Sequence, residues 1–171
     1  SSLRKQIAFV PQEVFLFSDT IFNNITLYDE HISIFQLKEA AKEIGIDDFI
    51  SSLPGGYHYI VGERGVTLST GQRQLIAFLR VYVRNPKILI LDEATSSIDT
   101  ETEQLLQIAL EKIAVNRTLI VIAHRLSTIR NANKILLFKD GEILEHGSHK
   151  ELMLQKGIYQ KMYSTQQFGE D

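Results

Sequence analysis

The chain has 171 residues, of which 44% are hydrophobic, and its formal net charge is −3. A chain of this length can bury a sizeable core as one domain, or as one domain with a small lobe. The weak negative charge gives no support for binding to nucleic acid or to an anionic membrane surface. No apolar run approaches the roughly 18 residues of a membrane-spanning helix, and the absence of cysteine excludes disulfides and thiolate metal sites.

Short apolar runs and amphipathic stretches alternate along the chain. Apolar runs bounded by turn residues predict strands over residues 6–10, 88–91, 118–123, 134–138 and 142–146. Helical spacing of apolar residues predicts a short helix through Ile25 and further helices over 33–44, 47–53, 73–84, 100–114 and 148–156. The expected capping residues are Asp19 or Thr20, Ser33 with Gly45 as the stop, and Ser148 with Glu151. We expect 88–91 to be a central strand covered on both faces, and 118–123 to be a second buried strand.

Two carboxylates, Asp92 and Glu93, directly follow the apolar run 88–91. In open α/β sheets, ligands gather at the carboxyl ends of the strands. A nucleotide enzyme would use the first carboxylate to hold Mg²⁺ and the second to polarise the water that attacks the γ-phosphate. The alternative is that both residues simply cap the next element.

Three further segments indicate a function only when they are considered together. The segment Leu68–Gln72 opens a helical stretch, where the Ser69 hydroxyl and the backbone at Gly71 could bind an anion. The alternative is an ordinary N-cap supplied by Ser69 or Thr70. Gln12 follows the first strand and His124 follows the strand 118–123, and each alone carries little weight.

Taken in order, these segments resemble the motifs of ATP-binding-cassette (ABC) ATPases over nearly the whole chain. The similar segments are Val10–Gln12 (Q-loop), Leu68–Gln72 (signature), Ile88–Asp92 (Walker B), Glu93 (catalytic glutamate), Ser97–Asp99 (D-loop) and His124 (switch histidine). The resemblance implies an α/β fold with a RecA-like P-loop NTPase parallel sheet core and an ABC helical subdomain. The core would comprise residues 1–18 and 86–171, and the helical subdomain residues 19–85.

The resemblance also implies an ATPase that uses ATP and Mg²⁺ in a head-to-tail pair with a second ABC cassette. Ser69, Gly71 and Gln72 would contact the γ-phosphate of ATP held by the other cassette. Asp99 would act across the same interface. Phosphoryl transfer then needs no covalent intermediate, because positioning and charge stabilisation carry it.

Four residues would act on the nucleotide from the other side of that site. By the same resemblance, Asp92 would bind Mg²⁺, and Gln12 would join the metal and the water to the transporter interface. Glu93 would act on the attacking water. His124 would contact the γ-phosphate.

The chain departs from the family in two respects. Thr70 stands where the signature usually has glycine, so its side chain would restrict the approach of a phosphate. No glycine is followed by lysine, so the phosphate-cradling Walker A motif is missing. We therefore expect a truncated, C-terminal piece of a larger protein that is inactive by itself. We also expect uncovered apolar surface on its central sheet, and self-association as the result.

Two segments favour an exporter. Val61–Gly65, and Phe15–Ser18 after Gln12, are similar to exporter segments. The resemblance implies contacts of the Gln12 loop, Glu63 and Arg64 with a transmembrane domain, at the cytoplasmic face of a membrane (the cell inner membrane in a bacterium). The alternative for Val61–Gly65 is a charged turn in a solvated loop. We expect His31, His58, His146 and His149 to be surface residues without a metal.

Two other functions remain open at this point. One is a soluble ABC ATPase of DNA repair or translation, although the chain lacks the coiled-coil insertions or basic faces that such proteins often have. The other is a non-catalytic interaction module. A degenerate Glu93 or His124 would have favoured that module, and both residues are intact.

Overall fold

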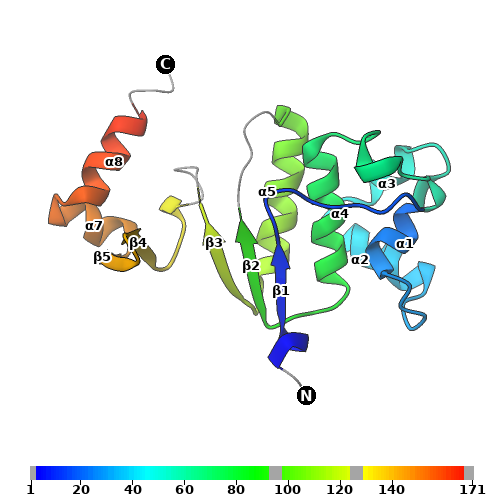
Figure 1. The fold of residues 1–171 in the computed structure, drawn as a ribbon, viewed down its shortest axis with the longest axis horizontal. Helices are drawn as coiled ribbons and strands as arrows, with labels where there is room; N and C mark the ends of the chain where they lie inside the picture. The colour runs from blue at the N-terminus through cyan, green and yellow to red at the C-terminus, as the bar shows by residue number, and fades with distance from the viewer. Residues whose placement is uncertain (1–2, 93–97, 124–128, 168–171) are drawn as a thin grey trace. The chain divides into compact units, whose positions relative to one another are not determined.

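The computed structural model describes residues 3–92, 98–123 and 129–167 (Figure 1). The chain divides into two compact units, Ser1–Ile122 and Ala123–Asp171. The predicted residues Glu93 and His124 lie outside the described residues.

The first unit contains a parallel sheet with the strand order β1-β2-β3. Its strands are β1 (Ile7–Val10), β2 (Ile88–Asp92) and β3 (Thr118–Ile122). The first strand is shorter than predicted, because Gln6 belongs to a preceding 3-10 turn, η1 (Leu3–Gln6). The central position predicted for residues 88–91 is confirmed.

In the described part of the first unit, five α-helices lie to one side of the sheet (Figure 1). They are α1 (Ile21–Thr26), α2 (Ile34–Ile44), α3 (Asp47–Ser52), α4 (Thr70–Tyr82) and α5 (Thr100–Ala114), with 3-10 turns η2 (Gly56–His58) and η3 (Glu63–Gly65). The predicted bounds of α5 are confirmed. The prediction for α4 was wrong at both ends: the helix begins at Thr70 because Ser69 caps it, and it ends at Tyr82 rather than Arg84.

Side-chain caps account for where α1, α2, α4 and α5 begin. The Thr20 side chain accepts a hydrogen bond from the Asn23 amide at the start of α1, which decides between the two predicted caps. Ser33 forms a complete capping box with Gln36, and Gly45 ends α2 in the left-handed conformation with φ 83°. Such caps satisfy amides and carbonyls that the helix itself leaves unpaired.

The two faces of the sheet differ sharply in burial. In the parallel register, Val10, Leu91 and Val121 point to one face, where they pack in the main core with the helices. The residue before each of these, Phe9, Ile90 and Ile120, points to the opposite face. There, Phe9 is 55% exposed and Ile120 is 48% exposed.

This asymmetry overturns two predictions. The central strand was expected to be covered on both faces, but Ile88 and Ile90 are only partly buried. The third strand was expected to be buried, but Ile120 and Ile122 are about half exposed. The error has a physical cause: an all-apolar run indicates a strand, but only the tertiary arrangement decides how many faces are covered.

From Ile135 to Gln167, the second unit is a hairpin followed by two helices. Strands β4 (Ile135–Lys139) and β5 (Glu142–Gly147) pair antiparallel, and helices α7 (His149–Gln155) and α8 (Ile158–Gln167) follow. The predicted tight turn is confirmed at Asp140 and Gly141, whose φ angles are 52° and 84°. A small core forms around Leu152, Tyr159 and Tyr163. The sequence analysis did not predict α8.

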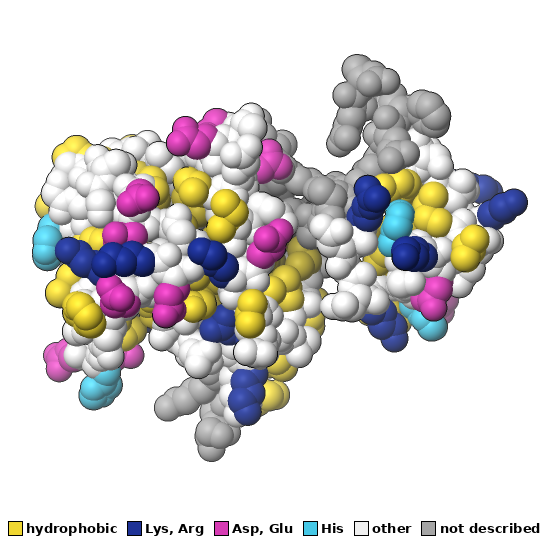
Figure 2. Space-filling model, turned by 180° about the vertical axis from the view of Figure 1, so that it is seen from behind, with side chains coloured by type: hydrophobic (Ala, Val, Ile, Leu, Met, Phe, Trp, Pro, Cys, Tyr) yellow, Lys and Arg dark blue, Asp and Glu magenta, His cyan; other side chains and the backbone are white. Residues whose placement is uncertain are grey.

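The surface and the helix lengths are consistent with the composition. Figure 2 shows acidic and basic side chains intermixed over one face of the first unit, rather than a field of one sign. None of the described helices is both long and apolar enough to span a bilayer.

Candidate nucleotide site

The carboxyl ends of the three parallel strands meet at one edge of the sheet. Val10 pairs with Leu91, and Asp92 pairs with Ile122, so the segments that follow the strands start at this edge. Gln12 is exposed and lies two residues beyond Val10. The structure therefore brings Gln12 and Asp92 to the edge at which ligands bind in open α/β sheets.

The possible metal ligands at this edge suit Mg²⁺ better than they suit a metal ion that is coordinated by protein side chains alone. Asp92 is partly buried and projects to the same face as Ile88 and Ile90. Within the described residues, no group of three or more His, Cys, Asp or Glu side chains could hold a metal ion. Mg²⁺ retains several waters and usually takes one or two protein ligands together with phosphate oxygens. The Asp92 carboxylate and the Gln12 amide are a ligand set of that kind.

Ser69 caps α4 and still has a proton to donate. Its Oγ accepts a hydrogen bond from the Gln72 amide (3.2 Å), and its own amide donates to Gln72 Oε1 (3.0 Å). In the other two capping boxes the serine hydroxyl also donates to the side chain three residues later, from Ser33 and from Ser148. The Ser69 hydroxyl has no such acceptor among the described residues, so its O–H is available to a ligand.

Gly71 is buried against helix α5. A β-carbon at position 71 would overlap the Thr102 γ-methyl group and would come within 2.9 Å of Ile98 Cγ2. The glycine is therefore required for helix packing, a reason that the motif resemblance did not suggest. Its amide, like that of Thr70, has no hydrogen-bond acceptor among the described residues.

Asp99 lies at the corresponding end of α5. Its Oδ1 accepts a hydrogen bond from the Thr102 amide (2.8 Å), and this contact lowers the pKa of Asp99 below its ordinary value. Because Gly71 meets Thr102, the positive N-terminal ends of α4 and α5 lie next to one another. The structure thus gathers Ser69, Gly71, Gln72 and Asp99 at one end of a helix pair.

Thr70, the residue that departs from the signature pattern, is bound by an arginine that the sequence analysis overlooked. Arg73 Nη2 donates to the Thr70 hydroxyl (3.1 Å), and Nη1 donates to the Leu68 carbonyl (2.9 Å) and, at 3.4 Å, to that of Gly65. The same guanidinium therefore joins the Leu68–Gln72 segment to the turn η3. No sequence pattern signals this contact, because two of its acceptors are main-chain carbonyls.

Of the predicted partner-contacting residues, Gln12 and Glu63 are exposed, and Glu63 lies in η3. Nearby in sequence to Gln12, the rings of Phe15 and Phe17 form an edge-to-face pair with centroids 5.1 Å apart, and both are about half exposed. Leu27 and Tyr28, directly after α1, are also exposed. We call these four exposed residues, three of which are aromatic, the aromatic patch: Phe15, Phe17, Leu27 and Tyr28.

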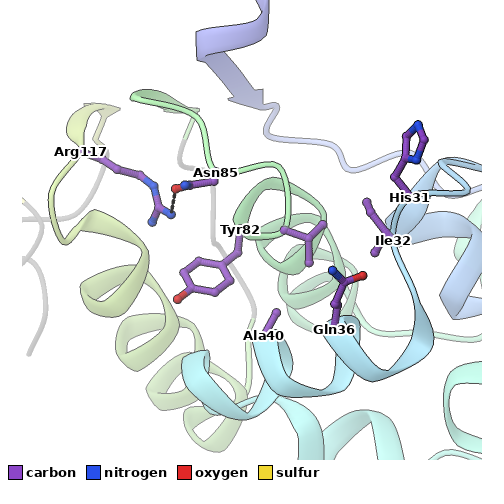
Figure 3. Close-up of a pocket in the computed structure, with 8 residues that line it drawn as sticks. His31, Ile32, Gln36, Ala40, Tyr82, Asn85 and Arg117 are labelled. Carbon is purple, nitrogen blue, oxygen red and sulfur yellow. Dashed lines mark hydrogen bonds between the residues drawn. The ribbon is translucent and has the colours of Figure 1, made fainter.

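A separate pocket of about 430 Å³ lies between α2 and the end of α4 (Figure 3). Arg117 at one end donates to Asn85 Oδ1 (2.8 Å), and its guanidinium lies 5.1 Å from the Tyr82 ring centroid. His31 lies at the other end. None of the predicted site residues lines this pocket, so it is not the candidate nucleotide site.

The fold and these motifs define a class of protein that comparison with known families identifies. Residues 1–96 match the family model described as ABC transporter, and the chain belongs to that family. More particularly, it is part of the ATP-binding domain of an exporter-type ABC protein. Family membership implies ATP and Mg²⁺ binding in the parent proteins.

Individual relatives support the exporter class. The chain is 51% identical over 164 residues to ABC transporter B family member 13 of Arabidopsis thaliana, covering 96% of this chain and 13% of that protein. It is 51% identical over 168 residues to the ATP-dependent lipid A-core flippase of Legionella pneumophila (strain Paris), covering 98% of this chain and 29% of the flippase. The chain therefore spans less than a third of the length of either relative.

A solved structure supports the fold. The structure of a bacterial Atm1-family ABC exporter with ATP bound matches with a TM-score of 0.85 and 44% sequence identity. The match covers 95% of this chain and 28% of that exporter chain. The predicted α/β fold of a P-loop NTPase is thereby confirmed.

Proposed function

We propose that this chain supplies one side of a composite ATP site that powers an ABC exporter. The observation that carries the proposal is the Ser69 O–H beside the amides of Thr70 and Gly71 at the start of α4, none of which has an acceptor in the part of the chain that the structure describes. Hydrogen-bond donors at a helix N-terminus bind phosphate. In the proposed arrangement, Ser69, Gly71 and Gln72 donate to a γ-phosphate held by a second cassette, and Asp99 lies at the same interface.

Other residues of the chain serve the nucleotide at its own strand edge. Asp92 and Gln12 are the proposed magnesium ligands, Glu93 the group that orients the attacking water, and His124 a γ-phosphate contact. Bound Mg²⁺ would neutralise charge on the phosphates. The strand register supports the first two assignments, because Asp92 ends β2 and Gln12 follows the adjacent strand β1. We further propose that residues 1–18 and 86–171 belong to the ATPase core and residues 19–85 to the helical subdomain.

The 171-residue chain by itself is proposed to be inactive. It has no glycine followed by lysine, and therefore no Walker A motif to hold the β- and γ-phosphates. Calorimetric titration of the purified chain with Mg-ATP should show no binding in the micromolar range. Micromolar binding by the monomer would contradict this part of the proposal.

The partner of the exposed segments is proposed to be the cytoplasmic extension of an exporter's transmembrane domain. The aromatic patch supports this, because exposed aromatic residues are enriched where proteins meet. Glu63 and Arg64 would add charged contacts beside it, as would the Gln12 loop. This assignment places the domain at the cytoplasmic face of a membrane.

A chimera tests the composite site. The matching segment of the Legionella flippase would be replaced by this chain, and ATP hydrolysis would be measured in the reconstituted membrane protein. We expect hydrolysis by the chimera, and its loss in variants Asp92→Asn and Ser69→Asp. Aspartate is as good an N-cap as serine, so Ser69→Asp preserves the helix while it places a negative charge against the phosphate.

The control and the contradicting outcomes are equally specific. Ser69→Thr keeps both the cap and a hydroxyl proton, so it should retain most of the hydrolysis. A folded chimera that cannot hydrolyse ATP would favour a non-catalytic module. Wild-type hydrolysis by Ser69→Asp would show that Ser69 does not meet the phosphate.

A further inference from the structure

Two arginines near the end of α4 contact main-chain carbonyls of residues 15–26. Arg80 lies in the last turn of α4, and Arg84 lies two residues beyond the helix. Arg80 Nε donates to the Asn24 carbonyl (2.8 Å), and its Nη2 donates to the Phe15 carbonyl (3.4 Å). These bonds join residues more than fifty positions apart in sequence.

Arg84 extends the same set of contacts along α1. Its Nη1 donates to the carbonyls of Ile25 (3.3 Å) and Arg80 (2.8 Å), and its Nη2 donates to that of Thr26 (2.9 Å). The acceptors in the described residues are thus all main-chain oxygens, most of them at the C-terminal end of α1. Helix carbonyls at that end otherwise lack partners.

Placing these two charges here has a cost. Burial lowers the pKa of Arg80, and the neighbouring charge of Arg84 lowers it further. Burial also lowers the pKa of Arg84, against a smaller opposing effect of Asp29. A partly buried cation gives up hydration, and hydrogen bonds to carbonyls return only part of it. Simple helix packing would be served by apolar side chains, so the guanidiniums indicate a need for defined geometry.

The carbonyls held by Arg84 directly precede an unusual turn. Leu27 and Tyr28 both have positive φ, 51° and 61°, a conformation that non-glycine residues adopt only when their surroundings impose it. Both side chains are exposed, at 41% and 64%. The contacts that hold this turn in place therefore come from residues packed behind it. Arg84 binds the Thr26 carbonyl, and Asp19 accepts a hydrogen bond from the Tyr28 hydroxyl.

The other half of the aromatic patch is fixed through the same arginine pair. The Asn24 side chain accepts from the Phe17 amide (2.8 Å) and donates to the Phe17 carbonyl (3.0 Å). The main-chain oxygen of Asn24 is held by Arg80, which also binds the Phe15 carbonyl. Both halves of the patch thus attach to one side of α4.

We propose that Arg80 and Arg84 are positioning residues through which helix α4 holds the aromatic patch in a fixed geometry. The geometry of the patch then depends on the helix that begins at Ser69. That the patch meets a partner rests on the proposed function, but the positioning itself is a property of the isolated chain.

Amide hydrogen exchange in the purified 171-residue chain tests the positioning. The amides of Leu27 and Asp29 are hydrogen-bonded within the turn, to the carbonyls of Asn23 and Thr26. Arg84→Lys keeps the charge but loses the fork that spans neighbouring carbonyls. Loss of a charged hydrogen bond should speed exchange at these two amides by at least about tenfold.

Arg117→Lys is the matched control. Arg117 also donates to main-chain carbonyls, of Pro86 and Ile113, but it has no contact with α1 among the described residues. It should lower overall stability without selectively exposing the Leu27 and Asp29 amides. Arg80→Lys should instead speed exchange at the Phe17 amide, which depends on Asn24.

The outcomes separate the two levels of the proposal. If Arg84→Lys speeds exchange at Leu27 and Asp29 no more than at core amides of α2, Arg84 is merely structural and the inference fails. Equal selectivity in Arg117→Lys would overturn it as well. An inactive flippase chimera would sink the proposed function but would leave the exchange result, and the positioning role, intact.

Discussion

Gly71 and Thr102 pack so closely that a β-carbon on the glycine would overlap the threonine methyl group. The contact locks the start of α4 to the start of α5, and with it Ser69 to Asp99. The absence of a side chain at position 71 would let a phosphate come close to the backbone. The same absence is also needed for the packing of α4 against α5.

Gly71→Ala should therefore destabilise the chain although alanine favours helices. Overpacking of this kind costs about 1–3 kcal/mol, which exceeds the gain in helix propensity of up to about 1 kcal/mol. Thr102→Ser removes the obstructing methyl, so it should recover part of the loss in the double variant. Urea unfolding of all four proteins gives the coupling energy, and simple additivity would contradict the steric account.

Glu145 should be required for α8. Its carboxylate accepts hydrogen bonds from the amides of Ile158 (2.6 Å) and Tyr159 (3.0 Å), at the positive end of the helix. Glu145→Ala should cost about 1–2 kcal/mol, with amide exchange increasing mainly in α8. Glu142→Ala, on the same strand and exposed, is the control and should leave α8 unchanged.

Gly157 provides an independent check on the same contact. A β-carbon there would overlap the Glu145 carboxylate. Gly157→Ala should therefore release α8 as Glu145→Ala does. The double variant should be little worse than either single one. Fully additive losses would mean that the two residues act separately.

Stability should fall in acid in part through Asp99. The Thr102 amide lowers the pKa of Asp99 in the folded chain, so unfolding raises that pKa. The resulting stabilisation is present above the ordinary pKa, near pH 4, and is lost as the pH falls through the lower folded-state value. Asp99→Asn keeps an equally good cap but cannot ionise. Its urea midpoint between about pH 2 and 6 should fall less steeply, and an unchanged slope would refute the assignment.

The uncovered sheet face should cause self-association. Phe9, Ile90 and Ile120 lie in one register row on that face, with Ile122 beyond them. Contiguous exposed apolar surface favours contact between copies. Light scattering should show association that Ile120→Thr weakens, by about tenfold for an energetically central residue. Leu154→Ser, at an 81% exposed site on α7, should have no effect. A monomer at high concentration would contradict the prediction.

Elements whose ends are set by nearby residues could be predicted from the sequence, and elements that depend on distant contacts could not. Ser33, Gly45 and the apolar spacing between them specify α2 within a dozen residues, so its bounds were predictable. Helix α8 was missed because its N-terminal amides are capped by Glu145 from the preceding strand, which no local pattern shows.

The same distinction applies to the functional residues: the motifs indicated some of them, and others became visible only in the structure. The resemblance predicted that Gln12 and Asp92 lie around one cleft, and the strand register puts the ends of β1 and β2, which precede or carry these residues, at the same edge of the sheet. The roles of those two residues remain predictions. Arg80 and Arg84 could not be found, because main-chain carbonyls accept hydrogen bonds whatever side chain they carry.

The strand order also constrains how the polypeptide acquires its structure. β1 precedes the whole helical segment, and its sheet neighbour β2 follows it. Pairing between them must close a long loop, which slows folding, whereas α2 and α4 can form from nearby residues. During synthesis on the ribosome, the edge of β1 that pairs with β2 therefore stays unpaired until β2 emerges. Slowing translation between these two strands would prolong the interval in which Phe9 and Val10 are open to misassembly.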